Sequence, residues 1–331
     1  MPKIVKYALS MIFCFTVLIV AVYASNGRVA SAPIWQETMY EVESLNLRQQ
    51  GLDIRGEVPV ILEEFGASYE NLNQEIENAV NTLAEGTRRI RARHVTFRYE
   101  IESTNEVVSI VIYATARAVT DRTTVLSVNF NPRNGNLVTL TQAARNRDIT
   151  PLVEGKIAEM IRQDPATYYA AFTAPATGQA FYVTNTELVL LFDEFQLSSV
   201  PGATSEIRFV LDSIREYTIR NDEYRISNDR YAIRMIPVRR VLEGLGYGVR
   251  WEQSEGEAII TLNGQAVIIL RPGENNYQLN GVLQRSLETA PLLTGGNMYV
   301  PISFFDQILG LTAFTVDSRG DITFITYLGR A

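Results

Sequence analysis

An internal repeat in the last third of the chain most constrains its fold. Residues 236–246 align with residues 300–310, and each copy carries Pro at its second position and ends in Leu-Gly. Proline suits the first turn of a helix, and glycine adopts the left-handed conformation that ends one. Each copy therefore predicts a short helix. Strand-like residues follow at 247–251 and 312–316, so the repeat predicts two equivalent helix–strand units in one domain.

A hairpin lies between the two copies. Asn263-Gly264 is a strong two-residue turn signal, and it joins the strand-like segments 257–262 and 265–270. The pattern of the chain changes at about Asp222. We therefore predict that residues 222–328 form a small β-rich domain with two short helices.

The preceding region, residues 36–217, mixes helix and strand patterns. Apolar residues recur at three- and four-residue steps through 68–85, which predicts an amphipathic helix, and Thr150-Pro151 predicts the start of a second helix. Alternation or short apolar runs predict strands at 39–47, 59–62, 94–102, 106–118, 122–131, 180–184, 186–192 and 205–211. The fold class expected is α+β, with a mainly antiparallel sheet and packed helices in this first domain. We place the junction with the second domain near 219–225.

Residues 1–24 have the pattern of an export signal. Lys3 and Lys6 precede an apolar stretch from Ala8 to Val22, and Ala24 ends a small-residue cleavage pattern. The alternative is an uncleaved N-terminal anchor, because the stretch is near the lower limit for spanning a bilayer. Both interpretations place residues from about 35 onward outside the cytoplasm, either secreted or associated with the cell surface. Membrane contact is expected only through this segment, if it is uncleaved.

The charge of the chain argues against nucleic acid as a partner. The formal net charge is −7, and removal of the two leader lysines leaves −9. Binding to a phosphate backbone depends on clustered Lys and Arg. The one basic run, 88–93, has the composition of a solvated helix end.

The sequence holds too few Cys and His residues for a metal site, and a single histidine for any Ser-His or Cys-His nucleophilic site. The only cysteine, Cys14, lies in the leader, and His94 is the only histidine. A structural zinc site uses about four Cys or His ligands, and copper also prefers His, Cys or Met. We therefore expect no metal, no cofactor and no enzymatic activity.

Two carboxylate pairs, Glu63-Glu64 and Asp193-Glu194, are the remaining candidates for chemistry. A glycosidase needs two carboxyl groups that face each other across a cleft, and neighbours on a strand point to opposite faces. Asp193 stands between aromatic residues at the end of a strand, and such a combination suits a sugar or a basic protein. The candidate ligand-binding residues are Tyr182, Phe192, Asp193 and Phe195.

The first domain carries several ordered motifs. Phe130-Asn131-Pro132, the segment 135–140, the segments 181–184 and 188–195, and Pro201-Gly202 follow in order. With these motifs, residues 38–215 resemble the extracytoplasmic region shared by RsiV-type anti-sigma factors and PdaC-type peptidoglycan deacetylases. At most six residues precede the apolar leader, so an anti-sigma role is not expected, and no deacetylase motif follows. Binding of lysozyme by RsiV-type proteins indicates a ligand class only.

The second domain has motifs of another family. Its residues 235–239, Leu245-Gly246, 249–251 and 298–302 are similar to those of the copper amine oxidase N-terminal-like domain, or stalk domain, of secreted bacterial proteins.

The two resemblances imply an exported binding or sensing module of the cell envelope. The expected partner is a cell-wall glycan such as peptidoglycan, or an extracellular protein such as a lysozyme. Two alternatives stay open: a hydrolase that acts on the wall through carboxylates, and a non-catalytic structural spacer.

Overall fold

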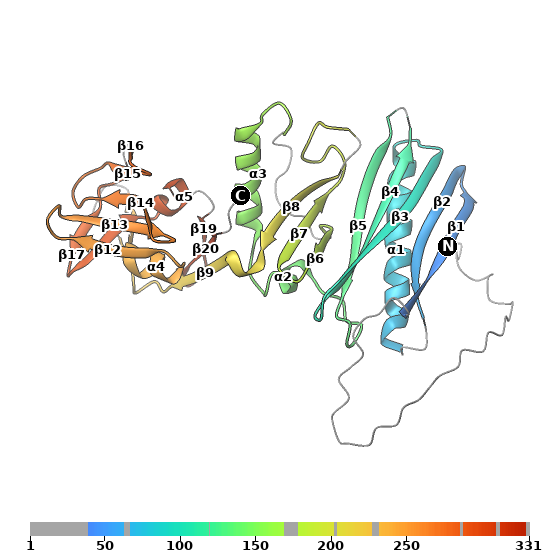
Figure 1. Cartoon of the computed structure of the whole chain (residues 1–331), viewed down its shortest axis with the longest axis horizontal. Coiled ribbons are helices and arrows are strands. Elements are labelled where there is room, and N and C mark those ends of the chain that lie inside the picture. Colours follow the sequence, from blue (N-terminus) through green and yellow to red (C-terminus); the bar gives the residue numbers. More distant parts are fainter. Residues whose placement is uncertain are drawn as a thin grey trace, which may run out of the picture. The chain divides into compact units, whose positions relative to one another are not determined.

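The computed structural model describes residues 39–62, 67–118, 120–168, 178–201, 204–226, 232–284, 287–308 and 312–328. These residues belong to one compact unit that spans 34–331. The predicted leader, residues 1–24, and the pair Glu63-Glu64 lie outside the described residues. The described chain is a sheet-rich α+β protein (Figure 1), which confirms the expected fold class at that level.

The first sheet has five strands in the order β1-β2-β3-β4-β5. Their bounds are β1 Tyr40–Gln49, β2 Leu52–Ile61, β3 His94–Ser103, β4 Val108–Arg117 and β5 Arg122–Phe130. Neighbouring strands pair antiparallel, except that β2 and β3 pair in parallel. Helix α1 (Ala67–Arg89) provides the crossover that a parallel pair requires.

Helix α1 covers one face of this sheet (Figure 1) because its apolar residues lie on one stripe. Leu72, Ile76 and Leu83 are buried there. They share a core with sheet residues such as Phe97 and Ile110, both of which are almost fully buried. The predicted helix 68–85 is confirmed, and it continues for one further turn.

A second sheet, with the order β6-β7-β8, comprises Phe181–Val183, Glu187–Phe192 and Ser205–Val210. Helices α2 (Leu140–Ala143) and α3 (Thr150–Gln163) accompany it, and α3 buries Leu152 and Ile157 in its core. This sheet contacts the first one. The hydroxyl oxygens of Ser109 and Ser127 accept hydrogen bonds from the backbone N–H groups of β6 at 3.2 and 2.9 Å.

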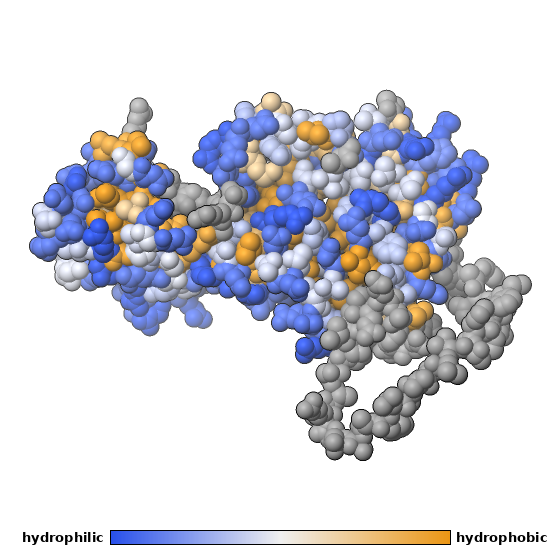
Figure 2. Space-filling view, viewed as in Figure 1, coloured by the Kyte–Doolittle hydropathy of each residue, from blue (hydrophilic) through white to orange (hydrophobic). Residues whose placement is uncertain are grey.

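The rest of the chain is built mainly of short strands. The bounds are β9 Ile214–Ile219, β10 Arg225–Ile226, β11 Arg234–Pro237, α4 Val238–Gly244, β12 Gly248–Glu252, β13 Glu257–Leu262, β14 Gln265–Leu270, β15 Tyr277–Leu279, β16 Val282–Gln284, β17 Leu292–Thr294, β18 Asn297–Pro301, α5 Ser303–Ile308, β19 Thr312–Val316 and β20 Ile322–Tyr327. They form sheets with the orders β10-β11-β18-β17, β12-β13-β14-β15-β16 and β19-β20-β9. Figure 2 shows hydrophobic surface over the β15–β16 hairpin, where Val282 and Leu283 are exposed.

The repeat appears as two helices that each follow a strand. Both β11 and β18 end in proline, at Pro237 and Pro301, and the two strands pair with each other. Gly246 ends the first copy with φ of +94°, as expected for a left-handed helix terminus. Leu309 and Gly310, the corresponding end of the second copy, lie outside the described residues.

Strand β20 contributes to two cores. Ile322 and Phe324 lie in the core of the carboxyl-terminal part, whereas Ile325 and Tyr327 lie in the core of the second sheet. The division follows from the alternation of side chains along a strand. The two regions that the sequence separates near 219–225 therefore share their last strand. Their boundaries at 36–217 and 222–328 stay a prediction.

Candidate functional site

The four residues expected to bind ligand lie on β6, on β7 and in the turn that follows β7. Phe192 is fully buried in the core of the second sheet, so its ring packs inside and does not face solvent. Phe195 is partly buried and has φ of 64°, which is uncommon for a bulky residue. Tyr182 is also partly buried, and its hydroxyl accepts a hydrogen bond from Nη2 of Arg208 at 2.9 Å.

Asp193 and Glu194 both contact the edge strand β5. The Oδ1 atom of Asp193 accepts from the backbone N–H of Val125 at 2.8 Å, and Oε2 of Glu194 accepts from that of Thr123 at 2.7 Å. The expectation that the two carboxylates point to opposite faces is wrong, because β7 ends at Phe192 and both residues lie beyond it. Burial raises the pKa of Asp193, although the bond from Val125 and the charge of Arg122 act in the opposite direction.

The structure therefore does not gather the four residues around one opening. Tyr182 is engaged by Arg208, which also forms ion pairs with Glu187 and Glu206. Asp193 is engaged by β5. A ligand-binding role for Tyr182, Phe192, Asp193 and Phe195 stays a prediction. The contacts described for Tyr182, Phe192 and Asp193 stabilise the fold.

A groove in the carboxyl-terminal part has a better geometry for a ligand. Its volume is about 490 Å³, and residues from α4, β12, β13 and the β17–β18 turn line it. Trp251 is a partly buried aromatic residue of this groove, and Gln253 accepts a hydrogen bond from its indole N–H at 3.0 Å. This hydrogen bond and the partial burial of the ring restrain its orientation. Such a groove combines an apolar surface with a few oriented polar groups, as ligand sites usually do.

Polar side chains also line the groove. Arg239 and Arg250 both line the groove and are exposed. Arg250 pairs with Glu252 at 3.0 Å, whereas Arg239 has no carboxylate partner among the described residues. Asn297 adds an exposed amide to the lining. The groove therefore offers an aromatic side chain, an arginine that has no carboxylate partner in the described ranges, and hydrogen-bonding groups.

The sequence contains a signal for this groove. Pro237 ends β11 and starts α4, which leaves Arg239 exposed on the first turn. A tryptophan between Arg250 and Glu252 on an otherwise ordinary strand is the second sign. The meeting of these segments with Asn297 depends on the pairing of β11 with β18, and sequence spacing does not reveal it.

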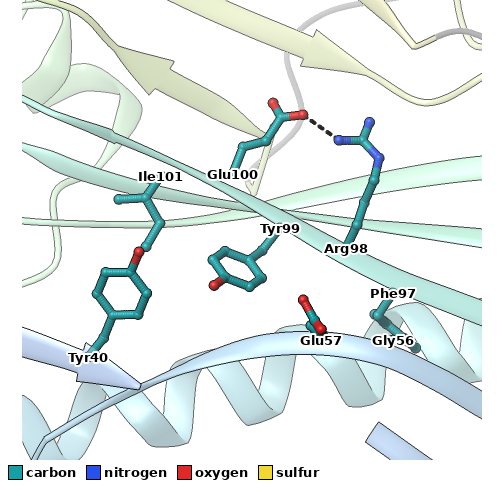
Figure 3. Close-up of a pocket in the computed structure, with 8 residues that line it drawn as sticks. All are labelled: Tyr40, Gly56, Glu57, Phe97, Arg98, Tyr99, Glu100 and Ile101. Carbon is teal, nitrogen blue, oxygen red and sulfur yellow. Dashed lines mark hydrogen bonds and ion pairs between the residues drawn. The ribbon is translucent and has the colours of Figure 1, made fainter. Parts of the chain in front are cut away.

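A second hollow, of about 550 Å³, lies in the first sheet between β2 and β3 (Figure 3). Its lining includes Tyr40, Glu57 and Tyr99. The rings of Tyr40 and Tyr99 meet edge to face, with their centres 6.3 Å apart. Burial, followed by the proximity of Tyr40 and Glu57, raises the pKa of Tyr99.

The histidine has a partner where the parallel pairing of β2 with β3 begins. Nδ1 of His94 lies 3.1 Å from a carboxylate oxygen of Asp53, which β2 places beside it. Within the described ranges, no group of three or more His, Cys, Asp or Glu residues could hold a metal ion. No helix in the described part of the chain is long and apolar enough to cross a membrane.

The groove belongs to a segment with a family match. Residues 224–323 match the copper amine oxidase N-terminal domain, which confirms the resemblance expected for this part of the chain. A relative in Brevibacillus choshinensis bears the name protease inhibitor and is 35% identical over 75 residues. That match covers 23% of this chain and 22% of the relative, so the chain spans less than a quarter of that protein.

Two solved structures of the DUF3298 family are similar to this chain at low sequence identity. One is from Bacteroides fragilis, with a TM-score of 0.33 and 10% identity over 52% of this chain and 91% of that one. The other is from Pseudomonas aeruginosa, with a TM-score of 0.35 and 12% identity over 54% and 92%. The resemblance of residues 38–215 to RsiV-type and PdaC-type proteins stays a prediction.

Proposed function

We propose that the chain is an exported, non-catalytic binding protein of the cell envelope, and that the Trp251 groove binds a cell-wall glycan. The carrying observation is that one groove is lined both by Trp251, whose indole N–H is bonded to Gln253, and by Arg239, which has no carboxylate partner among the described residues. A sugar ring presents C–H groups on its faces and hydroxyl groups on its edge. The aromatic face suits the former, and the arginine and amide groups suit the latter.

The guanidinium of Arg239 selects the kind of glycan. A guanidinium binds carboxylates through paired, charge-assisted hydrogen bonds. Peptidoglycan carries carboxylates on its sugars and stem peptides, so it suits Arg239 better than a neutral polysaccharide does. The body of the protein is acidic, and the attraction is therefore local and should weaken as salt rises.

The test is co-sedimentation of the leader-free chain with purified peptidoglycan, with cellulose as the neutral polysaccharide. Arg239→Ala and Trp251→Phe should each reduce the bound fraction. Arg319→Ala is the matched control, because Arg319 is an exposed arginine that does not line the groove. Equal sedimentation of the parent and both groove variants would refute the proposal. Release of soluble wall fragments would instead support the hydrolase. Absence of both binding and release would support the structural spacer.

A further inference from the structure

The first sheet opens between its second and third strands. The parallel pairing of β2 with β3 covers four residues and ends at Gly56 and Phe97. Beyond this point, residues 57–61 of β2 continue to pair with β1, and residues 98–103 of β3 continue to pair with β4. The two strands therefore separate within the sheet, and the hollow of about 550 Å³ lies in the resulting gap (Figure 3).

Gly56 fixes the place where the strands separate. Its φ is +124°, and a Cβ atom there would lie 2.0 Å from the carbonyl oxygen of Phe97. Only glycine permits both the backbone conformation and this close approach. The gap is therefore encoded at a defined residue of β2.

Within the part of the chain that the structure describes, no strand pairs with the side of β3 that faces the gap. The β3–β4 ladder continues into the bond from the N–H of Thr104 to the carbonyl of Val107. In such a ladder, hydrogen-bonded positions alternate. The even-numbered residues of β3 thus bond to β4, and Tyr99 and Ile101 turn their backbone groups toward the gap. An open row of this kind is a template for another strand.

The opposite side of the gap, on β2, offers fewer backbone groups for pairing. The same alternation turns Glu57, Pro59 and Ile61 toward β3. Proline has no N–H to donate, and the side-chain amide of Asn73 bonds both the N–H and the carbonyl of Ile61 at 2.8 Å. A segment that enters the gap therefore pairs with β3.

The side chains in the gap give it a negative charge. Glu57 is exposed and has no cationic partner among the described residues. Figure 3 shows Glu57 and Tyr99 pointing toward each other from the two strands, with the Arg98–Glu100 ion pair on the other side of β3. The guanidinium of Arg98 stacks on Tyr113, 3.6 Å from the ring centre. Arg98 therefore does not neutralise Glu57. The carboxylate of Glu57 and the phenol rings of Tyr40 and Tyr99 line the same hollow, which suits a cation.

We propose that an extended segment of a partner protein docks in this gap, pairs its backbone with Tyr99 and Ile101, and places a lysine or arginine side chain against Glu57. The strand edge of β3 and the carboxylate of Glu57 together define one kind of occupant. The strand edge binds a peptide backbone rather than a small molecule, and the carboxylate of Glu57, which has no cationic partner in the described part of the chain, favours a basic side chain. This site is separate from the Trp251 groove and is independent of the glycan proposal.

A synthetic peptide tests the proposal on the leader-free chain. The probe is a fluorescein-labelled octapeptide of alternating Thr and Val with one central Lys, and its binding is followed by fluorescence polarisation. We expect the Lys peptide to bind more tightly than its Glu counterpart. Glu57→Gln should weaken binding by up to about fivefold, the range of a solvent-accessible ion pair. Glu102→Gln is the matched control, since Glu102 is an exposed carboxylate of β3 that does not line the hollow.

Backbone pairing has its own test. N-methylation of the alternate amides on the pairing edge of the peptide should abolish binding, and methylation of the other edge should not. Ile101→Pro should also abolish it, because this N–H faces the gap and the β3–β4 ladder does not use it; circular dichroism checks the fold. Failure of the Lys peptide to bind at millimolar concentration, or equal binding of the Lys, Glu and methylated peptides, overturns the proposal. The proposal is also overturned if the Lys peptide binds a chain that begins at residue 36 but not the longer leader-free chain. In that case the chain's own preceding segment would occupy the gap.

Discussion

The carboxylate of Glu194 accepts a hydrogen bond from the backbone N–H of Thr123 at 2.7 Å, although 71 residues separate the two. The N–H of Glu194 in turn donates to the carbonyl of Thr123 at 2.9 Å. Glu194 is almost fully buried, and β5 is the edge of the first sheet. The turn after β7 therefore saturates an edge that would otherwise be open to another strand.

Replacement of Glu194 by Ala should lower the free energy of unfolding by about 1–3 kcal/mol, because a backbone donor loses its acceptor. Glu194→Gln keeps an acceptor oxygen and should cost less. Urea denaturation of the three proteins measures the difference. Equal midpoints for the Ala variant and the parent would show that water replaces the carboxylate without loss.

Asp193 should make stability depend on pH in a defined direction. Its pKa is raised in the folded protein, first by burial, so the folded state holds the proton more tightly than the unfolded chain. The contribution of this group to stability therefore falls as pH rises from about 4 through the raised pKa. Asp193→Asn keeps an oxygen for the N–H of Val125 and removes the titration. The stability of the variant relative to the parent should increase between pH 4 and 7 in chemical denaturation, and a constant difference would contradict the assignment.

Much of the secondary structure follows from local sequence. The predicted hairpin strands 257–262 and 265–270 coincide with β13 and β14, because Asn263-Gly264 supplies the turn and a short apolar run lies on each side of it. The predicted segment 59–62 is only the end of β2, which begins at Leu52. Leu52, Ile54 and Val58 alternate with charged residues there, but Gly56 stands at an apolar position of the alternation and weakens the pattern.

The candidate sites depend on contacts between distant segments of the chain, and local sequence patterns do not predict such contacts. Asp193 next to two phenylalanines has the composition of a ligand site, but the chain turns after β7 and directs the carboxylate at β5. The gap in the first sheet requires a parallel β2–β3 pair. Spacing along the chain does not show which strands become neighbours, and the sequence patterns favoured an antiparallel sheet.

The first copy of the repeat should be sensitive to both residues of its Leu-Gly end. Leu245 is fully buried in the carboxyl-terminal core, and its replacement by Ala should cost about 2–5 kcal/mol. Gly246→Val should also destabilise, because a β-branched residue disfavours a φ of +94°. Thermal melting measures both effects. Leu309→Ala and Gly310→Val test the second copy, and melting within a degree of the parent for all four would show that the repeat is not a structural pair.

Tyr327 provides the sharpest test of how the two predicted domains are joined. Its ring meets Phe209 edge to face with centres 5.2 Å apart, and its hydroxyl accepts from the N–H of Val210 at 3.2 Å. Both partners belong to β8, whereas Tyr327 ends β20, which pairs with β9 and β19. Tyr327→Ala should therefore destabilise the second sheet by about 3–5 kcal/mol, and Tyr327→Phe, which loses only the hydrogen bond, by about 1 kcal/mol.

Hydrogen exchange, measured peptide by peptide, shows which strands lose stability. In the Tyr327→Ala protein, faster exchange is expected in β7 and β8 as well as in β20, because Ile325 and Tyr327 lie in the core that contains those strands. Limited proteolysis of the parent should still cut first near 219–225, between β9 and β10. If exchange rises only after residue 222, the last strand belongs to the carboxyl-terminal domain alone, and the two domains fold independently.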